Sequence, residues 1–242
     1  MSIPGKQLVG LLRQATDHPT AQEQVLLRWD GILTQDSGAA ALYEFYLQAL
    51  QHWVVRHAAP ARLWDVLADW DANQILGFLQ HPTAEVFGSK PAEGRDRVLR
   101  ECLAEAFDQL AKLEGADPEK WTWGRLHVAR FRHPLDHAPD ARPYLDLGPV
   151  ARQGDGNAVG ATGFSRDSFE QVGGASYREI FDLSDWDKAV AINTPGQSGQ
   201  PGSPHYSDLL PLWSEWEYFP FVYSQRAVEN NATDRLILEP NP

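Results

Sequence analysis

Cysteine, positive charge and long apolar runs are scarce in this sequence. Its single cysteine, Cys102, excludes an internal disulfide and any cysteine-based zinc cluster, because each needs more than one thiol. Lysine and arginine number 21 against 33 aspartate and glutamate residues, which gives a net charge of −12. That charge repels a nucleic-acid backbone and an anionic membrane surface, so no nucleic acid is expected as a partner. No apolar run reaches the ~18 residues of a helical membrane span, so no membrane-spanning helix is expected.

The chain also lacks a recognisable leader, an internal repeat and any low-complexity tract. Residues 1–6 do not show the charged start, apolar centre and small-residue cleavage site of a signal peptide. What the chain has is 43% hydrophobic residues and nine tryptophans over 242 positions. This composition predicts a packed globular protein with a sizeable core.

Helical periodicity dominates the first half of the sequence. From about residue 20 to residue 113, apolar side chains recur at three- and four-residue spacing, which predicts a series of amphipathic helices. Asp36 and Ser37 are candidate N-caps for one helix, and Pro82 ends another. Cys102 falls on the apolar face of the last helix, where a small core residue is the favoured interpretation.

The composition changes at Gly115, after which prolines and glycines become frequent. Short strands are predicted at three places, residues 176–183, 190–193 and 236–239. An aromatic helix or turn is predicted over residues 209–223. The sequence therefore predicts an α+β protein, helical over 1–115 and β-rich over 116–242, with residue 115 as a change of layer within one body.

Several short motifs follow one another along the chain. They are Trp-Asp-Gly at 29–31, Trp-Gly-x-Leu-His at 123–127, Phe-x-His-Pro-Leu at 131–135, Gly-Asp-Gly-Asn at 154–157, Gly-Ala-Ser-Tyr-Arg at 174–178, Pro-Gly-Gln-Ser-Gly at 195–199 and Ser-Pro-His-Tyr-x-Asp at 203–208. In this order they resemble the penicillin amidase (penicillin acylase) family of N-terminal-nucleophile hydrolases. The likeness covers nearly the whole chain and falls on the carboxy-terminal part of the family's large (β) subunit. It implies that 1–242 is a single C-terminal portion of an αββα N-terminal-nucleophile hydrolase fold.

The resemblance implies that the parent protein hydrolyses a linear amide and so removes an acyl group from an amine. In relatives, a precursor is cut into a small subunit and a large one, and the serine that begins the large subunit attacks the amide carbon. Its own α-amino group serves as the base. The nucleophile and the oxyanion-stabilising asparagine belong to family segments without a match here, so no catalytic residue is expected in this chain.

Partners and surroundings follow from the same resemblance. The expected partners are the remaining segments of the precursor, namely the small subunit and the N-terminal part of the large one, and a small acyl-amide substrate. Penicillins, cephalosporin side chains, N-acyl homoserine lactones and acylated peptides are all compatible substrates. A periplasmic or secreted location is implied for the full-length parent. The alternative from another class is a non-catalytic binding or assembly module acting on its own.

Five residues are candidates for supporting an active site from beside or beneath it: Arg178, Asp182, Gln197, His205 and Tyr206. Arg178 and Asp182 lie on one face of a predicted strand, and if both are buried they need each other as an ion pair. The loop over residues 195–206 contains three prolines and three glycines. Prolines suit an ordered loop, so we expect His205 or Tyr206 to turn inward and form a hydrogen bond.

Two serines could be taken for nucleophiles. Ser198, His205 and Asp208 have the residue types of a catalytic triad, but all three lie in one loop region, which leaves little room for a distant group to orient the base. Removal of Met1 would expose Ser2, but the residues after it do not resemble those after the family's catalytic serine. Both serines are therefore interpreted as non-catalytic.

Two places in the sequence contain residue types that can bind a metal ion. The first is a group of three histidines and two aspartates, His127, His133, Asp136, His137 and Asp140. Their spacing fits no known zinc motif, and Pro134 breaks the one helical pair, so hydrogen bonds to the backbone are the favoured role. The second is Asp155, for which a tight turn capped by its own side chain is favoured over a calcium loop. Some family members bind calcium, which is compatible with the full enzyme, but no cofactor is expected in this chain.

Overall fold

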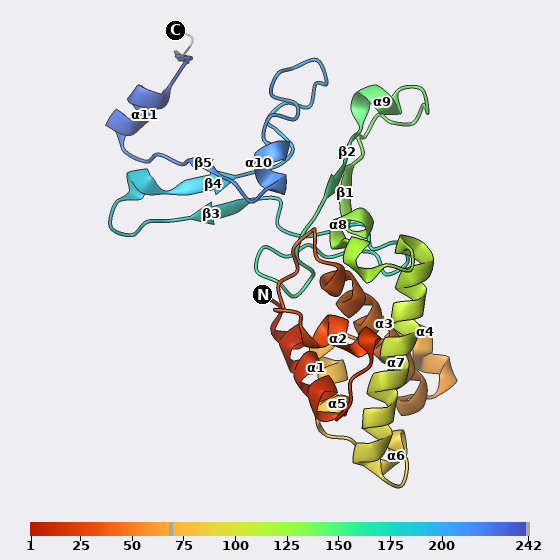
Figure 1. Cartoon of the computed structure of the whole chain (residues 1–242). Coiled ribbons are helices and arrows are strands. Elements are labelled where there is room, and N and C mark those ends of the chain that lie inside the picture. Colours follow the sequence, from red (N-terminus) through yellow and green to blue (C-terminus); the bar gives the residue numbers. More distant parts are fainter. Residues whose placement is uncertain (68–69, 241–242) are drawn as a thin grey trace. The chain divides into compact units, whose positions relative to one another are not determined.

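The computed structural model describes residues 1–67 and 70–240 and contains two compact units (Figure 1). Unit 1 comprises Met1–Arg130 and Pro149–Gly174, and unit 2 comprises Phe131–Gly148 and Ala175–Pro242. Strands β1 (Val128–Phe131) and β2 (Leu147–Ala151) form a two-stranded sheet through which the chain leaves unit 1 and returns to it. The compact units therefore do not divide at Gly115, where the composition changes.

Helices build unit 1. They are α1 (Ile3–Gln14), α2 (Ala21–Leu27), α3 (Gly38–Ala58), η1 (Ala61–Leu63), α4 (Trp64–Leu67), α5 (Ala72–Gln80), α6 (Ala84–Phe87), α7 (Pro91–Glu114), η2 (Pro118–Lys120) and α8 (Trp123–Leu126). The two longest, α3 and α7, lie side by side, and α1, α2, α5 and α6 pack on them (Figure 1). The predicted helical first half is thus confirmed. Across the described residues, no helix is both long and apolar enough to cross a membrane.

The sequence predicted helices only from about residue 20, but helix α1 forms earlier in the chain. Its signals are nevertheless local. Ser2 is the N-cap and accepts a hydrogen bond from Gly5 N (3.0 Å), and Pro4 occupies the first turn. Leu8 and Leu12, one turn apart, are buried in the core. Ser2 is therefore a structural residue, consistent with its interpretation as incidental to catalysis.

The core of unit 1 lies between α3 and α7. Ser37 caps α3 by accepting a hydrogen bond from Ala40 N (3.1 Å), as its position predicted. Because neighbours cover α3 on several sides, most of its residues are buried. Helix α7 presents a stripe that includes Leu99, Cys102 and Leu110. Cys102 is a buried core residue as predicted, and burial raises the pKa of its thiol to about 12.

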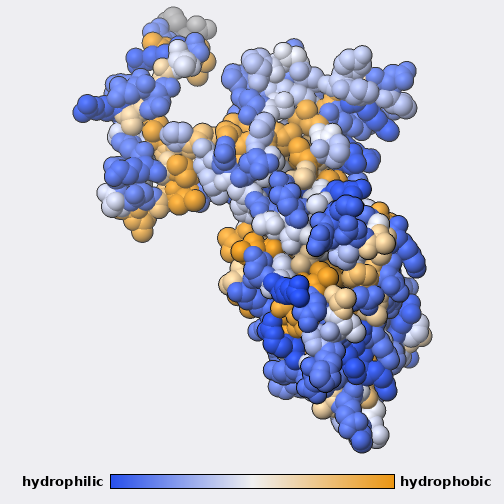
Figure 2. All heavy atoms as spheres, viewed as in Figure 1, coloured by the Kyte–Doolittle hydropathy of each residue, from blue (hydrophilic) through white to orange (hydrophobic). Residues whose placement is uncertain are grey.

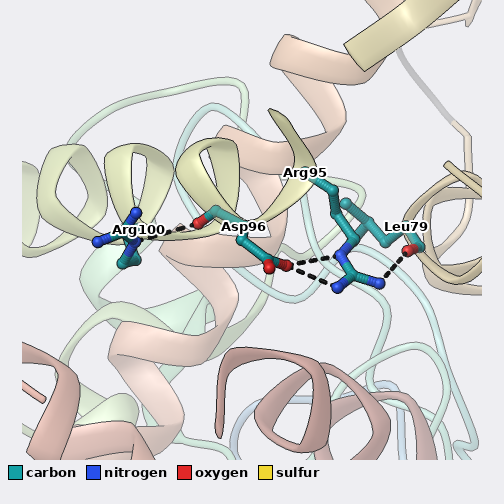
Figure 3. Close-up of polar contacts among 4 residues, drawn as sticks. All are labelled: Leu79, Arg95, Asp96 and Arg100. Carbon is teal, nitrogen blue, oxygen red and sulfur yellow. Dashed lines mark hydrogen bonds and ion pairs between the residues drawn. The ribbon is translucent and has the colours of Figure 1, made fainter. Parts of the chain in front are cut away.

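A polar cluster joins α7 to the end of α5 (Figure 3). The Arg95 guanidinium donates twice to Asp96 Oδ1, at 2.8 and 2.6 Å, and once to Leu79 O, at 3.5 Å. Leu79 is the penultimate residue of α5, where the helix dipole favours a positive charge. Arg100 Nε donates to Asp96 O (3.2 Å), so the same turn of α7 is held from both sides.

Unit 2 holds short elements connected by long loops. They are α9 (Arg142–Leu145), β3 (Arg178–Ile180), η3 (Trp186–Lys188), β4 (Val190–Ile192), α10 (Leu210–Ser214), β5 (Phe219–Pro220) and α11 (Gln225–Asn231). The strands form an antiparallel sheet of order β3-β4-β5, in which Arg178 faces Ile192 and Ala191 faces Phe219. The strands predicted over 176–183 and 190–193 are therefore present in shorter form.

Two expectations about the second half are wrong. Residues 236–239 were predicted to form a strand, but they are irregular and exposed. A strand needs a neighbour for its backbone hydrogen bonds, and this apolar segment has none in the described part of the chain. The second half as a whole consists mostly of loops, because its frequent prolines and glycines interrupt every strand after a few residues.

Candidate functional site

Arg178 in unit 2 is buried, with 8% of its surface exposed, and enclosed by aromatic rings. Its Nη2 donates to Trp213 O at 2.6 Å. The guanidinium carbon lies 4.3 Å from the ring centroid of Trp216 and 5.6 Å from that of Tyr218. Nε and Nη1 have no hydrogen-bond acceptor among the described residues, so the ring faces supply most of the attraction to the charge. Burial lowers the pKa of Arg178 because it disfavours the charged form.

The predicted ion pair between Arg178 and Asp182 is wrong. Asp182 Oδ1 instead accepts hydrogen bonds from Ser184 N (2.8 Å) and Ser184 Oγ (2.6 Å), and these bonds lower the pKa of its carboxyl group. Strand β3 ends at Ile180, so the alternation that placed the two residues on one face does not extend to Asp182. The turn that follows β3 directs this carboxylate to its own backbone.

The loop over residues 195–206 is closed by its own backbone, as predicted. Gln197 N and Ser198 N both donate to His205 O, at 2.9 and 3.0 Å. A Cβ on Gly196 would lie 2.3 Å from His205 O, so only glycine fits there. Tyr206 is turned inward and its hydroxyl donates to Leu145 O, whereas the side chains of Gln197 and His205 are exposed.

His205 and Asp208 bring together two of the three groups of a catalytic triad. His205 Nδ1 lies 2.8 Å from Asp208 Oδ2, on the protein surface. Ser198 Oγ accepts a hydrogen bond from Gln200 N (3.1 Å), and its backbone rather than its hydroxyl contacts His205. The loop therefore orients a histidine but presents no nucleophile to it in the described structure.

Two histidines of the proposed cluster serve as backbone anchors in different units. In unit 1, burial lowers the pKa of His127 to about 4, so the neutral ring donates from Nδ1 to Phe169 O (2.9 Å). In unit 2, His133 Nδ1 accepts from Leu135 N (3.1 Å) and Nε2 lies 3.2 Å from Gly199 O. No group of three or more histidine, cysteine, aspartate or glutamate side chains could hold a metal within the described residues.

Asp155 occupies the tight turn that its motif predicted. Asn157 N donates to Asp155 Oδ1 (2.8 Å), and Gly154 has a φ of +86°, which suits glycine. The sequence did not predict the side chain that contacts Asp155. Asp155 is 2% exposed and is hydrogen-bonded to Glu44 of α3, which is 4% exposed. A signal existed, because Glu44 is the only charged residue between Ser37 and Arg56.

Both carboxyl groups of this pair have raised pKa values. Burial raises the pKa of Glu44 well above its ordinary value, and the nearby charge of Asp155 raises it further. Burial also raises the pKa of Asp155, although backbone N–H donors act in the opposite direction. The hydrogen bond between the two groups raises the pKa of Glu44 and lowers that of Asp155, so Glu44 is protonated more readily than Asp155.

The pair lies in the wall of a pocket of about 240 Å³ that belongs entirely to unit 1. Side chains from α3, the start of α5 and the loop after β2 line it: Glu44, Gln48, Gln51, Asp71, Asp155, Asn157, Phe164, Arg166 and Phe169. Asp71 is the N-cap of α5 and accepts from Asn73 N and Gln74 N, at 2.7 and 3.0 Å. The pocket thus combines carboxyl groups, amides and two aromatic rings.

Comparison with known proteins identifies the family. The penicillin amidase family profile matches residues 1–230, so the chain belongs to the penicillin amidase family. It is 26% identical to the acyl-homoserine lactone acylase QuiP of Pseudomonas aeruginosa, over 99% of this chain and 31% of that protein. It is 31% identical to the penicillin acylase 2 proenzyme of Pseudomonas sp. strain SE83, over 90% of this chain and 28% of that protein. The chain therefore spans about a third of the length of the curated relatives it matches.

A solved structure shares the fold. The thermostable penicillin G acylase of Alcaligenes faecalis superposes with a TM-score of 0.55 at 18% sequence identity. The superposition covers 100% of this chain and 47% of that one. The chain is thus a mixed α/β structure with a helical first half that corresponds to about half of a penicillin acylase chain.

Proposed function

We propose that this chain is the C-terminal part of the large subunit of an acylase that hydrolyses linear amides. The family match over residues 1–230 carries the proposal, because the penicillin acylases and acyl-homoserine lactone acylases among its relatives are amide hydrolases. The fold of the parent is then the αββα sandwich of N-terminal-nucleophile hydrolases, and this chain supplies one portion of it. The substrate is a small acyl amide, and the proposal specifies neither its acyl group nor its amine.

The chemistry would be performed by residues outside these 242 positions. A serine hydroxyl attacks the amide carbon, its α-amino group takes the proton, the amine leaves, and water then releases the acyl group from the serine. The geometry of this chain supports the placement of the catalytic residues outside it. Ser2 caps a helix, the Ser198 hydroxyl accepts from Gln200 N and has no hydrogen bond to the His205 ring, and Cys102 is buried.

The remaining segments of the precursor are the proposed partners, and the surface of unit 2 supports this. Large apolar side chains are exposed on and beside the sheet: Tyr177, Ile180, Phe181, Leu183, Trp186 and Phe221. Figure 2 shows this apolar surface over β3, β4 and β5. Contiguous apolar patches of this kind usually mark an interface. The exposed run Leu236, Ile237 and Leu238 adds a segment that can pair with a neighbouring strand.

The residues around Arg178 and Tyr206 would act by positioning. Arg178 fixes β3 against α10 and against Trp216 after it, and Tyr206 fixes the loop over 195–206 against Leu145. In the whole acylase these contacts would brace the part of the sheet that lies next to the catalytic serine. A periplasmic or secreted location of the parent is part of the same proposal and rests on the family alone.

The proposal is tested by comparing the chain with the protein that its source organism makes. Intact-mass measurement and sequencing should reveal an upstream subunit that begins with serine. That protein should hydrolyse phenylacetyl or long-chain acyl anilides, while the 242-residue chain alone should show only background hydrolysis.

Two variants show whether any turnover by the chain alone comes from a serine of this chain or from a contaminating enzyme. Turnover by the chain alone that survives Ser2→Ala but disappears with Ser198→Ala would show a self-contained active site and contradict the proposal. A source protein with no such upstream subunit and no acylase activity would instead favour a binding or assembly module.

A further inference from the structure

Two neighbouring side chains of unit 2 have buried N–H donors without an acceptor. Arg178 is 8% exposed, and its Nε and Nη1 have no hydrogen-bond partner among the described residues. The same is true of Nε1 of Trp216, whose ring centroid lies 4.3 Å from the guanidinium carbon. Buried N–H donors are nearly always paired in native proteins, so an acceptor for these three atoms is expected.

The contacts that Arg178 does form are with neutral groups. Nη2 donates to Trp213 O at 2.6 Å, which is a backbone carbonyl. The rings of Trp216 and Tyr218 attract the positive charge through their faces. A ring face nevertheless lacks the oxygen lone pairs that accept strong hydrogen bonds, so stacking stabilises the charge and leaves the N–H groups unpaired.

The acidic residues closest in sequence do not supply the missing acceptor. Glu179 follows the arginine on β3, so its side chain lies on the opposite face, where it accepts from the Tyr177 hydroxyl (2.7 Å). Glu215 and Glu217 flank Trp216 and are exposed. Within the described chain no carboxylate interacts with the guanidinium. A buried positive charge without a counterion is unfavourable.

Trp216 covers the guanidinium in a backbone conformation that bulky residues rarely adopt. Its φ is +62°, in the left-handed region, where a large side chain is strained. It belongs to the short turn over residues 215–218 between α10 and β5, and its ring is partly exposed whereas Arg178 is buried. A change of φ in this turn would relieve the strain and uncover Nε and Nη1.

We propose that Arg178 and Trp216 form a receptor for one carboxylate group, which enters when the turn over residues 215–218 opens. A carboxylate brings the missing negative charge and two oxygens, which accept from the guanidinium and from the indole N–H together. The surrounding rings suit a carboxylate carried on an aromatic group. It belongs either to a free carboxylic acid or to a side chain of another segment of the parent protein. The site is additional to the proposed hydrolysis and stands without it.

Sodium benzoate is the probe, and an NMR titration of the 242-residue chain at neutral pH is the first measurement. The indole N–H signal of Trp216 is assigned by its absence in Trp216→Phe. We expect this signal and the Nε–H signal of Arg178 to shift saturably with benzoate. Benzamide, which has the same ring without the charge, should produce no saturable shift. Sodium chloride at equal ionic strength controls for screening of surface charge.

Three variants, whose affinity for benzoate is measured by calorimetry, decide the assignment. Arg178→Met removes the charge and should abolish saturable binding. Arg226→Met changes an exposed arginine of α11 in the same unit and should leave the affinity unchanged. Trp216→Phe keeps an aromatic ring and removes the indole donor, so it should weaken binding at least about threefold. The indole signals of the remaining tryptophans check folding, and Trp216→Phe decides if Arg178→Met does not fold.

Absence of saturable binding, equal binding of benzamide, or equal affinity in wild type and Trp216→Phe would each overturn the proposal. A long-lived water beside the Trp216 indole N–H, with no response to benzoate, would assign the donors to ordered water instead.

Repeating the titration on the full protein identifies the source of the carboxylate. Retained binding indicates a free carboxylic acid. Lost binding, with the Trp216 signal already at the position that benzoate induces in the chain alone, indicates a carboxylate of the protein itself. Lost binding with that signal at its unbound position would contradict the proposal.

Discussion

Unit 1 and unit 2 handle their apolar side chains in opposite ways. Unit 1 encloses them in one continuous core, in which residues such as Leu50 and Leu99 have 0% exposure. In unit 2 the buried apolar residues are Ala189, Ala191, Ile192, Leu210 and Trp213 among those described. The side chains beside its sheet are open to solvent, with Leu183 at 85% exposure.

The difference shows which part of the chain is self-sufficient. Two long helices and their neighbours form a continuous apolar core, so we expect unit 1 to be stable by itself. A sheet of three very short strands cannot do so, and unit 2 depends on local anchors such as the aromatic enclosure of Arg178. Unit 2 is therefore expected to gain stability from the segments that cover it.

The largest effect is expected from emptying the core of unit 1. Leu99→Ala in α7 should lower the free energy of unfolding by about 2–5 kcal/mol, because it leaves a cavity between packed helices. Leu113→Ala on the same helix is the control, since Leu113 is 60% exposed and its loss should change stability by less than about 0.5 kcal/mol. Urea unfolding followed by circular dichroism measures both. Equal costs would show that unit 1 has no such core.

A smaller, local effect is expected at the anchor of unit 2. Arg178→Ala removes a charged hydrogen bond and the contact with Trp216, which should cost about 1.5–3 kcal/mol. No carboxylate is stranded, so the cost stays below that of a broken buried ion pair. Hydrogen exchange of β3 and β4 should speed up while exchange of α3 and α7 does not change.

Asp182→Asn is the matched control for that anchor. Because Asp182 pairs with Ser184 rather than with Arg178, its substitution should leave the exchange of β4 unaltered. Loss of protection as large as in Arg178→Ala would restore the ion pair that the structure contradicts.

The pH dependence of unit 1 should follow the buried carboxyl pair. The folded protein raises the pKa of Glu44, so its contribution to stability is complete below the ordinary value of 4.5 and is lost as pH rises toward the folded pKa. Glu44→Gln is neutral at every pH and keeps its contribution. The stability of wild type relative to this variant should therefore fall as the pH rises above about 4.5, by roughly 1.4 kcal/mol per unit of pKa shift.

Urea titrations of both proteins across that range measure the difference. Asp155 and Tyr43 also face this region, and Asp155 stays in both proteins, so the comparison isolates Glu44. A difference that stays constant with pH would show that Glu44 has an ordinary pKa.

The smallest effect is expected on the exposed sheet of unit 2. Leu183→Ser should change the stability of the chain by less than about 0.5 kcal/mol, because Leu183 packs on little within its own unit. Binding of a hydrophobic dye should decrease, since the apolar patch becomes smaller. A clear loss of stability would mean that Leu183 is covered in the isolated chain.

Patterns of local sequence predicted much of the fold. The helical first half, the cap at Ser37 and the burial of Cys102 all follow from spacing within one element. The closed loop that ends at Tyr206 follows from its prolines and glycines. In each case the residues that decide the structure lie close together in the sequence.

Long-range partners could not be predicted in this way. Glu44 stands out as the only charged residue between Ser37 and Arg56, but the sequence of the helix does not indicate that Asp155 is its partner. The rings around Arg178 come from a segment more than 30 residues later. The sequence-based prediction therefore chose the nearer carboxylate of Asp182, and that choice was wrong. The strand expected at 236–239 fails for a related reason, since strands depend on neighbours that local patterns do not specify.

Hydrogen exchange followed by mass spectrometry tests the comparison between the units most directly. It should be measured on the 242-residue chain alone and on the full protein that we propose contains it. We predict that α3 and α7 are strongly protected in both, whereas residues 177–192 and 219–240 are weakly protected in the chain alone and become protected in the full protein. Equal protection of those segments in both samples would contradict the account, because the apolar surface of unit 2 would then need no partner.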